Sequence, residues 1–353
     1  MKKILIFTGA GASAPLGLPT ATGFIDGVEN GRLPVTARVM EYLGTPASTD
    51  IEWILAALES FRTEVSFTEF MLPHLVAGQP NAEAGRPHIQ QRLATYRNEA
   101  RTELVRIKKL LFERLNKYDS DNAAKLYRAL LGQVKNQYPD SSISLVTTNY
   151  DLTVEAAIEH ADSKWKDIGV DEFNFGFSTR FGRPVYDAAQ DFGWSPHIVE
   201  YLKIHGSLDW HPDAQGGCTR SMANTVPDDP DRMIILYPGF KGVPEVEPFI
   251  SLHGRLNKRL SEADVAIVIG FAFRDAYINN IFENALRLRK DFHILYFNPL
   301  PLDEHPVGSV ARRLAGQYPR FTHHESYLEL SQTPLTFPEP PETQTVVQSG
   351  SAG

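Results

Sequence analysis

The feature that most constrains this chain is a short apolar run that ends in a glycine-rich turn. Residues 3–8 are followed at once by Gly9-Ala10-Gly11-Ala12-Ser13-Ala14, which satisfies the spacing G-x-G-x-x-[GA]. A continuous apolar run bounded by such a turn is typical of a parallel strand that is buried on both faces. Small residues after the strand let backbone N–H groups approach a pyrophosphate, so we expect a nucleotide-binding turn. The alternative is a tight turn without a ligand.

Similar apolar runs recur along the chain and alternate with helical patterns. Further strands are predicted at residues 143–147, 201–204, 234–237, 265–271 and 292–297. Apolar residues recur at helical spacing in 152–160 and 276–288, between these runs. This alternation predicts an α/β fold with a Rossmann-like, doubly wound parallel sheet.

The connection between the first two predicted strands is unusually long. Residues 26–140 contain only helical spacing and no buried-strand run, which predicts a large helical insertion after the first strand. The Rossmann-like core then comprises residues 1–25 and 141–330, with an irregular segment near 163–200. Residues 331–353 are rich in proline and polar residues, so we expect a disordered tail.

Composition and charge exclude several classes of protein. The chain has 353 residues, of which 42% are apolar and 22% charged, as in globular proteins. The net charge of −8 argues against nucleic-acid binding over the whole surface. The basic segment 97–117 favours a solvated helix face over a partner or nucleic-acid surface. Cys218 is the only cysteine and no apolar window is long enough for a membrane span, so we expect a cytoplasmic protein without disulfides.

The glycine turn is not followed by the pattern of a dehydrogenase. Such an enzyme continues into a long helix and a second strand that ends in an acidic residue about twenty residues on. Here Pro15, Gly17 and Pro19 break any helix within about one turn. Asp26 and Glu29 follow no predicted strand. We therefore expect the turn to hold a dinucleotide in another manner, without hydride transfer.

Further motifs follow the predicted strands in order along residues 3–300. They are Gly17-Leu18-Pro19, Thr148-Asn149-Tyr150-Asp151, His205-Gly206-Ser207, Val268-Ile269-Gly270 and Phe297-Asn298-Pro299. Together with the glycine turn, this set resembles the sirtuin family and its sirtuin-like NAD-consuming relatives. The resemblance implies an NAD site formed by Gly9, Ala10, Gly11, Ser13, Thr148, Asp151, Gly270, Phe271 and Asn298.

The sequence departs from the sirtuin deacylases in two places. Thr20-Ala21-Thr22 stands where the deacylases have Asp-Phe-Arg. The segment directly after His205 offers only His211 and Cys218, whereas the deacylases carry zinc ligands in paired C-x-x-C motifs. We therefore expect no zinc, and protein deacylation is disfavoured because the zinc module helps to form the acyl-lysine groove. The chain looks most like the zinc-less bacterial sirtuin-like NAD hydrolases, many of which act in antiphage defence beside a partner ATPase, Argonaute or sensor.

Two polar residues are the candidates for catalysis, Asn149 and His205. Cleavage of NAD needs no strong acid, but it needs a stabilised oxocarbenium-like transition state and a placed water. His205 could accept a proton from a ribose hydroxyl or from water, and the Asn149 amide could hold both. The structural alternatives are a hydrogen-bonded core histidine and a turn asparagine. Asp151 and Asp275 are natural N-caps of the helices that follow, and the resemblance also places Asp151 near the nicotinamide carboxamide.

We therefore expect an NAD hydrolase, with NAD as substrate and nicotinamide and ADP-ribose as products, that depletes NAD in antiphage defence. The alternatives are an NAD-dependent protein deacylase and a non-catalytic subunit that binds NAD or ADP-ribose and anchors a partner. An unrestrained NAD hydrolase would harm its own cell, so we expect control by a homo-oligomer or a partner protein. Direct contacts with nucleic acid or membranes are not expected.

Overall fold

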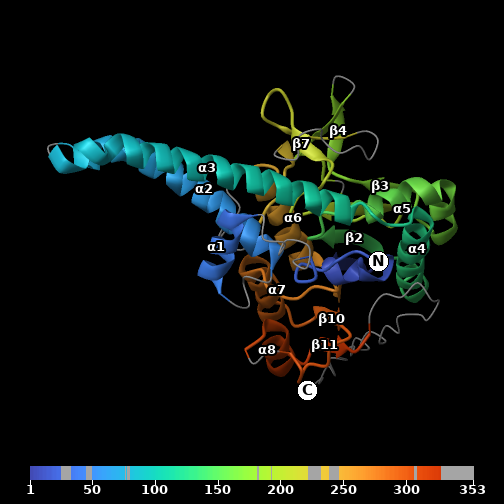
Figure 1. The fold of residues 1–353 in the computed structure, drawn as a ribbon. Helices are drawn as coiled ribbons and strands as arrows, with labels where there is room; N and C mark the ends of the chain where they lie inside the picture. Colours follow the sequence, from blue (N-terminus) through green and yellow to red (C-terminus); the bar gives the residue numbers. More distant parts are fainter. Residues whose placement is uncertain are drawn as a thin grey trace, which may run out of the picture.

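A seven-stranded parallel sheet forms the centre of the molecule (Figure 1). The computed structural model describes residues 1–24, 33–44, 50–75, 77, 80–180, 183–191, 193–221, 232–237, 246–305 and 308–326. The strands of this sheet are β1 (Lys3–Thr8), β2 (Ser142–Thr147), β3 (Glu172–Asn174), β6 (Ile198–Lys203), β9 (Val265–Ile269), β10 (His293–Phe297) and β11 (Phe321–His324). All neighbouring strands run parallel, which confirms the predicted α/β, Rossmann-like fold.

The sheet extends from β1 in both directions, with β2, β6 and β3 on one side and β9, β10 and β11 on the other. The strand order is β11-β10-β9-β1-β2-β6-β3, so the direction of winding reverses between β1 and β9. In doubly wound sheets, ligands bind outside the carboxyl ends of the strands at such a switch point. The topology alone therefore points to the crevice above β1 and β9.

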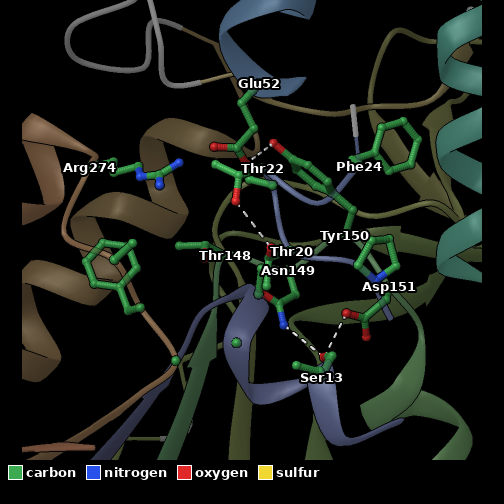
Figure 2. Close-up of a pocket in the computed structure, with 18 of the residues that line it drawn as sticks. Ser13, Thr20, Thr22, Phe24, Glu52, Thr148, Asn149, Tyr150, Asp151 and Arg274 are labelled. Carbon is green, nitrogen blue, oxygen red and sulfur yellow. Dashed lines mark hydrogen bonds between the residues drawn. The ribbon is translucent and has the colours of Figure 1, made fainter. Parts of the chain in front are cut away.

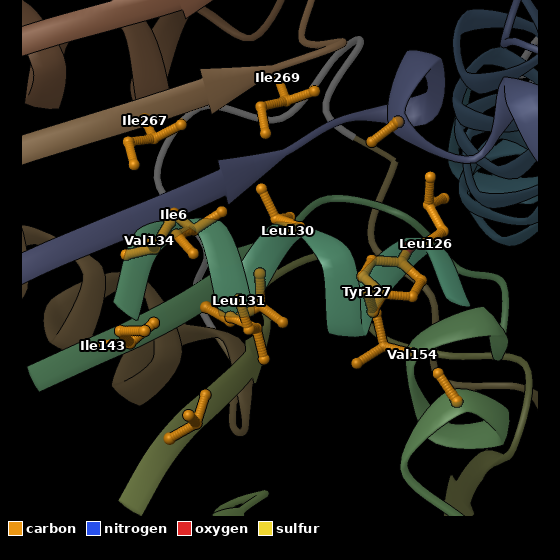
Figure 3. Close-up of a cluster of buried hydrophobic side chains, with 14 of the residues drawn as sticks. Ile6, Leu126, Tyr127, Leu130, Leu131, Val134, Ile143, Val154, Ile267 and Ile269 are labelled. Carbon is orange, nitrogen blue, oxygen red and sulfur yellow. The ribbon is translucent and has the colours of Figure 1, made fainter. Parts of the chain in front are cut away.

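Helices cover both faces of the sheet. Alternate residues of β1 point to opposite faces, so Ile4 and Ile6 belong to one buried cluster and Leu5 and Phe7 to another. The first cluster includes α4 (Ser120–Gln137) and α5 (Thr153–Ala161), and Figure 3 shows side chains of α4 against Ile6. The second includes α6 (Phe249–Glu262), α7 (Ala276–Leu288) and α8 (Val310–Gln317). The buried β1 strand thus lies between the two helical layers and contributes side chains to both clusters.

The segment between β1 and β2 is helical, as predicted. It contains α1 (Pro34–Leu43), α2 (Ile51–Leu75), α3 (Pro80–Leu115) and α4. Helices α2 and α3 pack side by side and extend away from the sheet as an arm (Figure 1). Helix α4 falls within the predicted insertion but covers the sheet. The predicted tail, 331–353, lies outside the described residues.

The basic segment 97–117 lies on α3 and makes ion pairs and hydrogen bonds with its neighbours. Arg97 pairs with Glu69 of α2 at 2.6 Å. The Arg114 guanidinium donates to the carbonyl of Phe24 at 2.9 Å. Buried Glu103 accepts hydrogen bonds from the backbone at the start of α1. These contacts join α3 to α1, to α2 and to the segment after the glycine turn.

One predicted strand is wrong. Residues 234–237 do not join the sheet, and only Ile235 forms an isolated antiparallel bridge, with Gly206. The apolar run is buried for a different reason, since Tyr237 packs in the cluster that α2 and α3 form. Conversely, β3 and β11 were not predicted, because both are short edge strands without a continuous apolar run. The predicted strand 265–271 ends at Ile269, where Gly270 turns the chain.

The predicted irregular segment near 163–200 contains several short elements. A 3-10 helix, η5 (Asp162–Ile168), and β3 are followed by β4 (Phe177–Arg180) and β5 (Arg183–Tyr186). Strands β4 and β5 form a small antiparallel sheet with β7 (Trp210–Pro212) and β8 (Cys218–Arg220). The strand order of this sheet is β4-β5-β8-β7.

The glycine turn packs directly on the end of β9. Gly11 N–H donates to the carbonyl of Gly270 at 3.0 Å, and a Cβ on Gly11 would lie 2.8 Å from Gly270 Cα. Gly270 has φ of 62°, and a Cβ there would lie 2.3 Å from the backbone nitrogen of Ala12. Two backbones therefore touch where side chains would keep them apart.

We expect Gly270→Ala to lower the free energy of unfolding by more than about 3 kcal/mol, because its methyl group meets backbone atoms. Gly169→Ala is the matched control, since Gly169 has φ of 74° but nothing within 4 Å of its Cβ position. The control should lose only about 1 to 2 kcal/mol, the cost of the left-handed conformation. Urea unfolding followed by circular dichroism measures both, and equal losses would contradict the close packing.

Candidate functional site

A pocket of about 740 Å³ lies at the carboxyl ends of the central strands (Figure 2). It is at the switch point between β1 and β9, where the topology predicts a ligand. The predicted site residues that line it are Ala10, Gly11, Ser13, Thr148, Asn149, Asp151, His205, Gly270, Phe271 and Asn298. Gly9 does not line it and lies behind, with its N–H bonded to the carbonyl of Ile269. The fold thus brings residues from five separate motifs to one pocket.

The glycine turn leads into two short 3-10 helices instead of a long helix. These are η1 (Ala10–Ala12) and η2 (Ala14–Leu16), and the second ends at Gly17 with φ of 81°. Pro15 is tolerated because it lies at the start of η2, where its missing N–H leaves no hydrogen bond unmade. The break predicted at Pro15 and Gly17 is therefore present.

Asn149 is 7% exposed, and its amide nitrogen is fully engaged by the protein. Nδ2 donates to the carbonyl of Gly9 at 3.1 Å and to Oγ of Ser13 at 3.0 Å. These two bonds fix the orientation of the amide, with Oδ1 on the other side. Oδ1 is buried and has no hydrogen-bond partner among the residues that the structure describes. Asn149 is therefore arranged to accept a hydrogen bond from a ligand, whereas the sequence suggested that it could both donate and accept.

Asp151 uses both carboxylate oxygens within the protein. Oδ1 accepts from the backbone N–H of Thr153 at 3.1 Å and from its hydroxyl at 2.6 Å, at the first residue of α5. Oδ2 accepts from Ser13 Oγ at 2.9 Å, as Figure 2 shows. The capping role predicted for Asp151 is therefore present, and the same carboxylate orients the serine that holds Asn149.

A buried lysine fixes the turn that carries Asn149 and Asp151. Lys203 is the last residue of β6 and is 2% exposed. Its ammonium group lies 3.2 Å from Glu155 and donates to the backbone carbonyls of Tyr150 and Asp151. Burial raises the pKa of Glu155, and the charge of Lys203 opposes that rise. The pair ties β6 to the turn after β2 and so supports the geometry of the pocket.

His205 is 2% exposed and is held by one carboxylate. Its Nε2 lies 3.2 Å from Oδ2 of Asp275, whose Oδ1 caps α7 by accepting from Ile278 N–H. Burial would raise the pKa of Asp275, but the hydrogen bond and charge of His205 lower it overall. An ionised Asp275 assigns the proton of a neutral His205 to Nε2. Nδ1, which is buried and has no hydrogen-bond partner in the described ranges, is then an unprotonated acceptor.

A second histidine stacks against His205. The rings of His205 and His253 lie 6.0 Å apart at 21°. Nδ1 of His253 bonds to the carbonyl of Phe249, and burial lowers the pKa of His253 to about 4. His253 therefore stays neutral near pH 7.

At the far end of the pocket the polar side chains are occupied by local bonds. The ring of Phe271 packs 4.9 Å from that of Phe7 in the core. Asn298 donates to Tyr296 Oη at 2.7 Å and accepts from the backbone N–H of Leu300 at 2.9 Å. A ligand here would meet mainly backbone and the small residue Gly270.

Sequence reasoning missed the residues that the helical segment brings to the pocket. Asp50 and Glu52 lie at the start of α2, and Phe24 precedes it. Asp50 pairs with Arg274 at 2.7 Å, and Glu52 accepts from Tyr150 Oη at 2.8 Å. Acidic residues are common at the start of a helix, so no local signal in the sequence links Asp50 and Glu52 to the site. The second role of Asp275, beside its cap, was also missed.

The described residues show no arrangement suited to a structural zinc. His211 and Cys218 lie on the neighbouring strands β7 and β8. Within the described ranges, no three His, Cys, Asp or Glu side chains are grouped to hold a metal ion. Among the helices that the structure describes, none is long and apolar enough to cross a membrane.

Comparisons with known proteins agree in part with the motif pattern. Solved structures similar to this chain include a Sir2 homologue in complex with NAD, at 16% identity, covering 85% of this chain and 78% of that chain with a TM-score of 0.41. Another is a mutant Sir2 homologue with 2'-O-acetyl ADP-ribose, at 15% identity, 85% and 81% coverage and a TM-score of 0.41. No curated protein matches the sequence. Residues 143–313 match the SIR2-like domain family, and over this region the chain is similar to that family.

Proposed function

We propose that this protein is an NAD hydrolase that cleaves the bond between nicotinamide and ribose to give nicotinamide and ADP-ribose. The observation that carries the proposal is a pair of buried, unpartnered acceptors in one pocket, Asn149 Oδ1 and His205 Nδ1. A buried polar atom without a partner costs free energy, about 1 to 3 kcal/mol, unless a ligand or water satisfies it. The match of residues 143–313 to a SIR2-like domain supports NAD as that ligand.

The two acceptors suit a reaction in which positive charge develops on ribose. The bond between C1' and the nicotinamide nitrogen breaks, its electron pair goes to nicotinamide, and water then adds to C1'. Asn149 Oδ1 accepts a hydrogen bond from a ribose hydroxyl or from this water. His205 Nδ1 accepts a proton from one of them, and Asp275 stabilises the imidazolium that forms.

The proposed site comprises the residues expected from the resemblance, except Gly9, which lies behind the pocket. Asn149 and His205 are catalytic, and the glycine turn with Ser13, Thr148 and Asp151 holds the ribose and pyrophosphate. Gly270, Phe271 and Asn298 line the adenosine side, mainly with backbone. The proposal needs no zinc and no acylated peptide, unlike a deacylase. A non-catalytic NAD-binding subunit is the remaining alternative.

The resemblance also supports a cellular role. We propose that depletion of NAD by this enzyme serves antiphage defence in the cytoplasm. Activity would be restrained by a homo-oligomer or by a partner ATPase, Argonaute or sensor.

The first prediction is that the full chain releases free nicotinamide from NAD with no acylated peptide present, because water is the proposed acceptor. Chromatography of nicotinamide and ADP-ribose during incubation with NAD measures it. Nicotinamide release that depends strictly on an acyl-lysine peptide would instead support a deacylase.

A second prediction separates chemistry from binding at His205. His205→Ala should lower kcat about a hundredfold or more, the usual scale for loss of a general base. Calorimetric titration with ADP-ribose should show little change in affinity. His211→Ala, on β7 outside the pocket, is the control and should keep the wild-type rate. Full turnover by a folded His205→Ala variant would make His205 structural.

A third prediction concerns zinc. Elemental analysis of the purified chain should find well under one zinc per molecule, because Cys218 has no partner cysteine in the sequence. Stoichiometric zinc that survives dialysis would refute it.

A further inference from the structure

Among the described residues of the helical segment, Glu52 places a carboxyl group in the pocket, and one of its oxygens makes no hydrogen bond with them. We propose that Glu52 is a further catalytic residue, which accepts the proton of the water that attacks ribose C1'. This inference rests on the proposed hydrolysis of NAD and assigns a chemical role to the helical segment.

The geometry places Glu52 inside the site. It is in the first turn of α2 and lines the pocket together with Asn149 and His205. Its Oε1 lies 2.8 Å from the hydroxyl of Tyr150, the residue after Asn149. Within the described part of the chain, Oε2 makes no hydrogen bond. Figure 2 shows the side chains of Glu52 and Arg274 entering the pocket from different elements.

The hydrogen bonds of Tyr150 accommodate both protonation states of Glu52. The tyrosine hydroxyl has one hydrogen but two acceptors, Glu52 Oε1 at 2.8 Å and the carbonyl of Leu236 at 2.9 Å. When Glu52 is ionised, the hydroxyl donates to it. When Glu52 is protonated, it donates to the tyrosine oxygen, and the hydroxyl turns to Leu236. The carboxyl group can therefore gain and lose a proton without leaving a buried donor unpaired.

The surroundings of Glu52 support proton transfer near neutral pH. Burial raises the pKa of Glu52 to about 7, and the hydrogen bond from Tyr150 opposes that rise. Asp50 and Asp275 raise it further, although Asp50 is itself paired with Arg274. A base is most effective when its pKa lies near the working pH.

The proposed step balances as follows. A lone pair of water forms the bond to C1' while the nicotinamide nitrogen keeps the electron pair of the bond that breaks. Glu52 takes one proton of the water, which is later released to solvent, and ADP-ribose keeps the other as a hydroxyl. His205 Nδ1 then accepts from the ribose hydroxyl, so Glu52 and His205 act on different oxygen atoms.

The test compares the pH dependence of kcat for NAD hydrolysis in three full-length variants. In the wild type, kcat should fall about tenfold per pH unit below the pKa of Glu52, about 7. Glu52→Gln should lose about a hundredfold in kcat at pH 8 and lack this acidic limb. Tyr150→Phe removes a bond that stabilises the ionised form, so its limb should move to higher pH, with the rate recovering there. Glu64→Gln, exposed on the same helix, should behave as the wild type.

The outcomes are distinct. Absence of turnover in the wild type overturns the proposed function and this inference with it. Wild-type turnover that Glu52→Gln retains overturns this inference alone. An acidic limb that stays in place in both Glu52→Gln and Tyr150→Phe assigns the limb to another group and also overturns it. Circular dichroism at pH 8 verifies that each variant is folded, and the Gln variant should unfold no earlier than the wild type, because it removes a charge that burial disfavours.

Discussion

The contact between two stretches of backbone, the glycine turn and Gly270, is the constraint on which the site depends. It fixes the turn after β1 to the end of β9, and these are the two strands between which the sheet reverses its winding. Because neither side has a Cβ, the polypeptide closes one wall of the pocket with peptide groups. Asn149 is then anchored on this wall through the carbonyl of Gly9. A displaced turn would therefore misplace the amide as well.

In this site, hydrogen-bond donors bind other groups of the protein, whereas acceptors remain for a ligand. Donors are used inside the protein: Asn149 Nδ2 binds Gly9 and Ser13, and the Nε2 proton of His205 faces Asp275. What remains toward the pocket are acceptors, Asn149 Oδ1 and His205 Nδ1. Such an arrangement favours hydroxyl groups, water and developing positive charge over anions.

Much of the fold could be predicted because its signals are local. The buried runs at 3–8 and 265–269 and the break at Pro15 and Gly17 depend on residues adjacent in sequence. The run at 234–237 misled for the same reason, because an apolar segment that packs in a helical cluster resembles one that enters a sheet. Glu52 and Tyr150 stand 98 residues apart, and only the packing of α2 beside the turn brings them together. No pattern within a window of sequence contains that information, and the same holds for the bond between Asp275 and His205.

Helix α2 has its first turn in the pocket and its last turn on the arm (Figure 1). With 25 residues and a rise of about 1.5 Å per residue, it is a rod roughly 37 Å long. When a rod of this length is fixed near one end, a small change in its angle there displaces the other end by a large distance. Conversely, a contact that holds the far end of α2 fixes the angle of the helix at the pocket closely. A displacement at the exposed tip of the arm therefore corresponds to a much smaller displacement of the carboxyl group of Glu52.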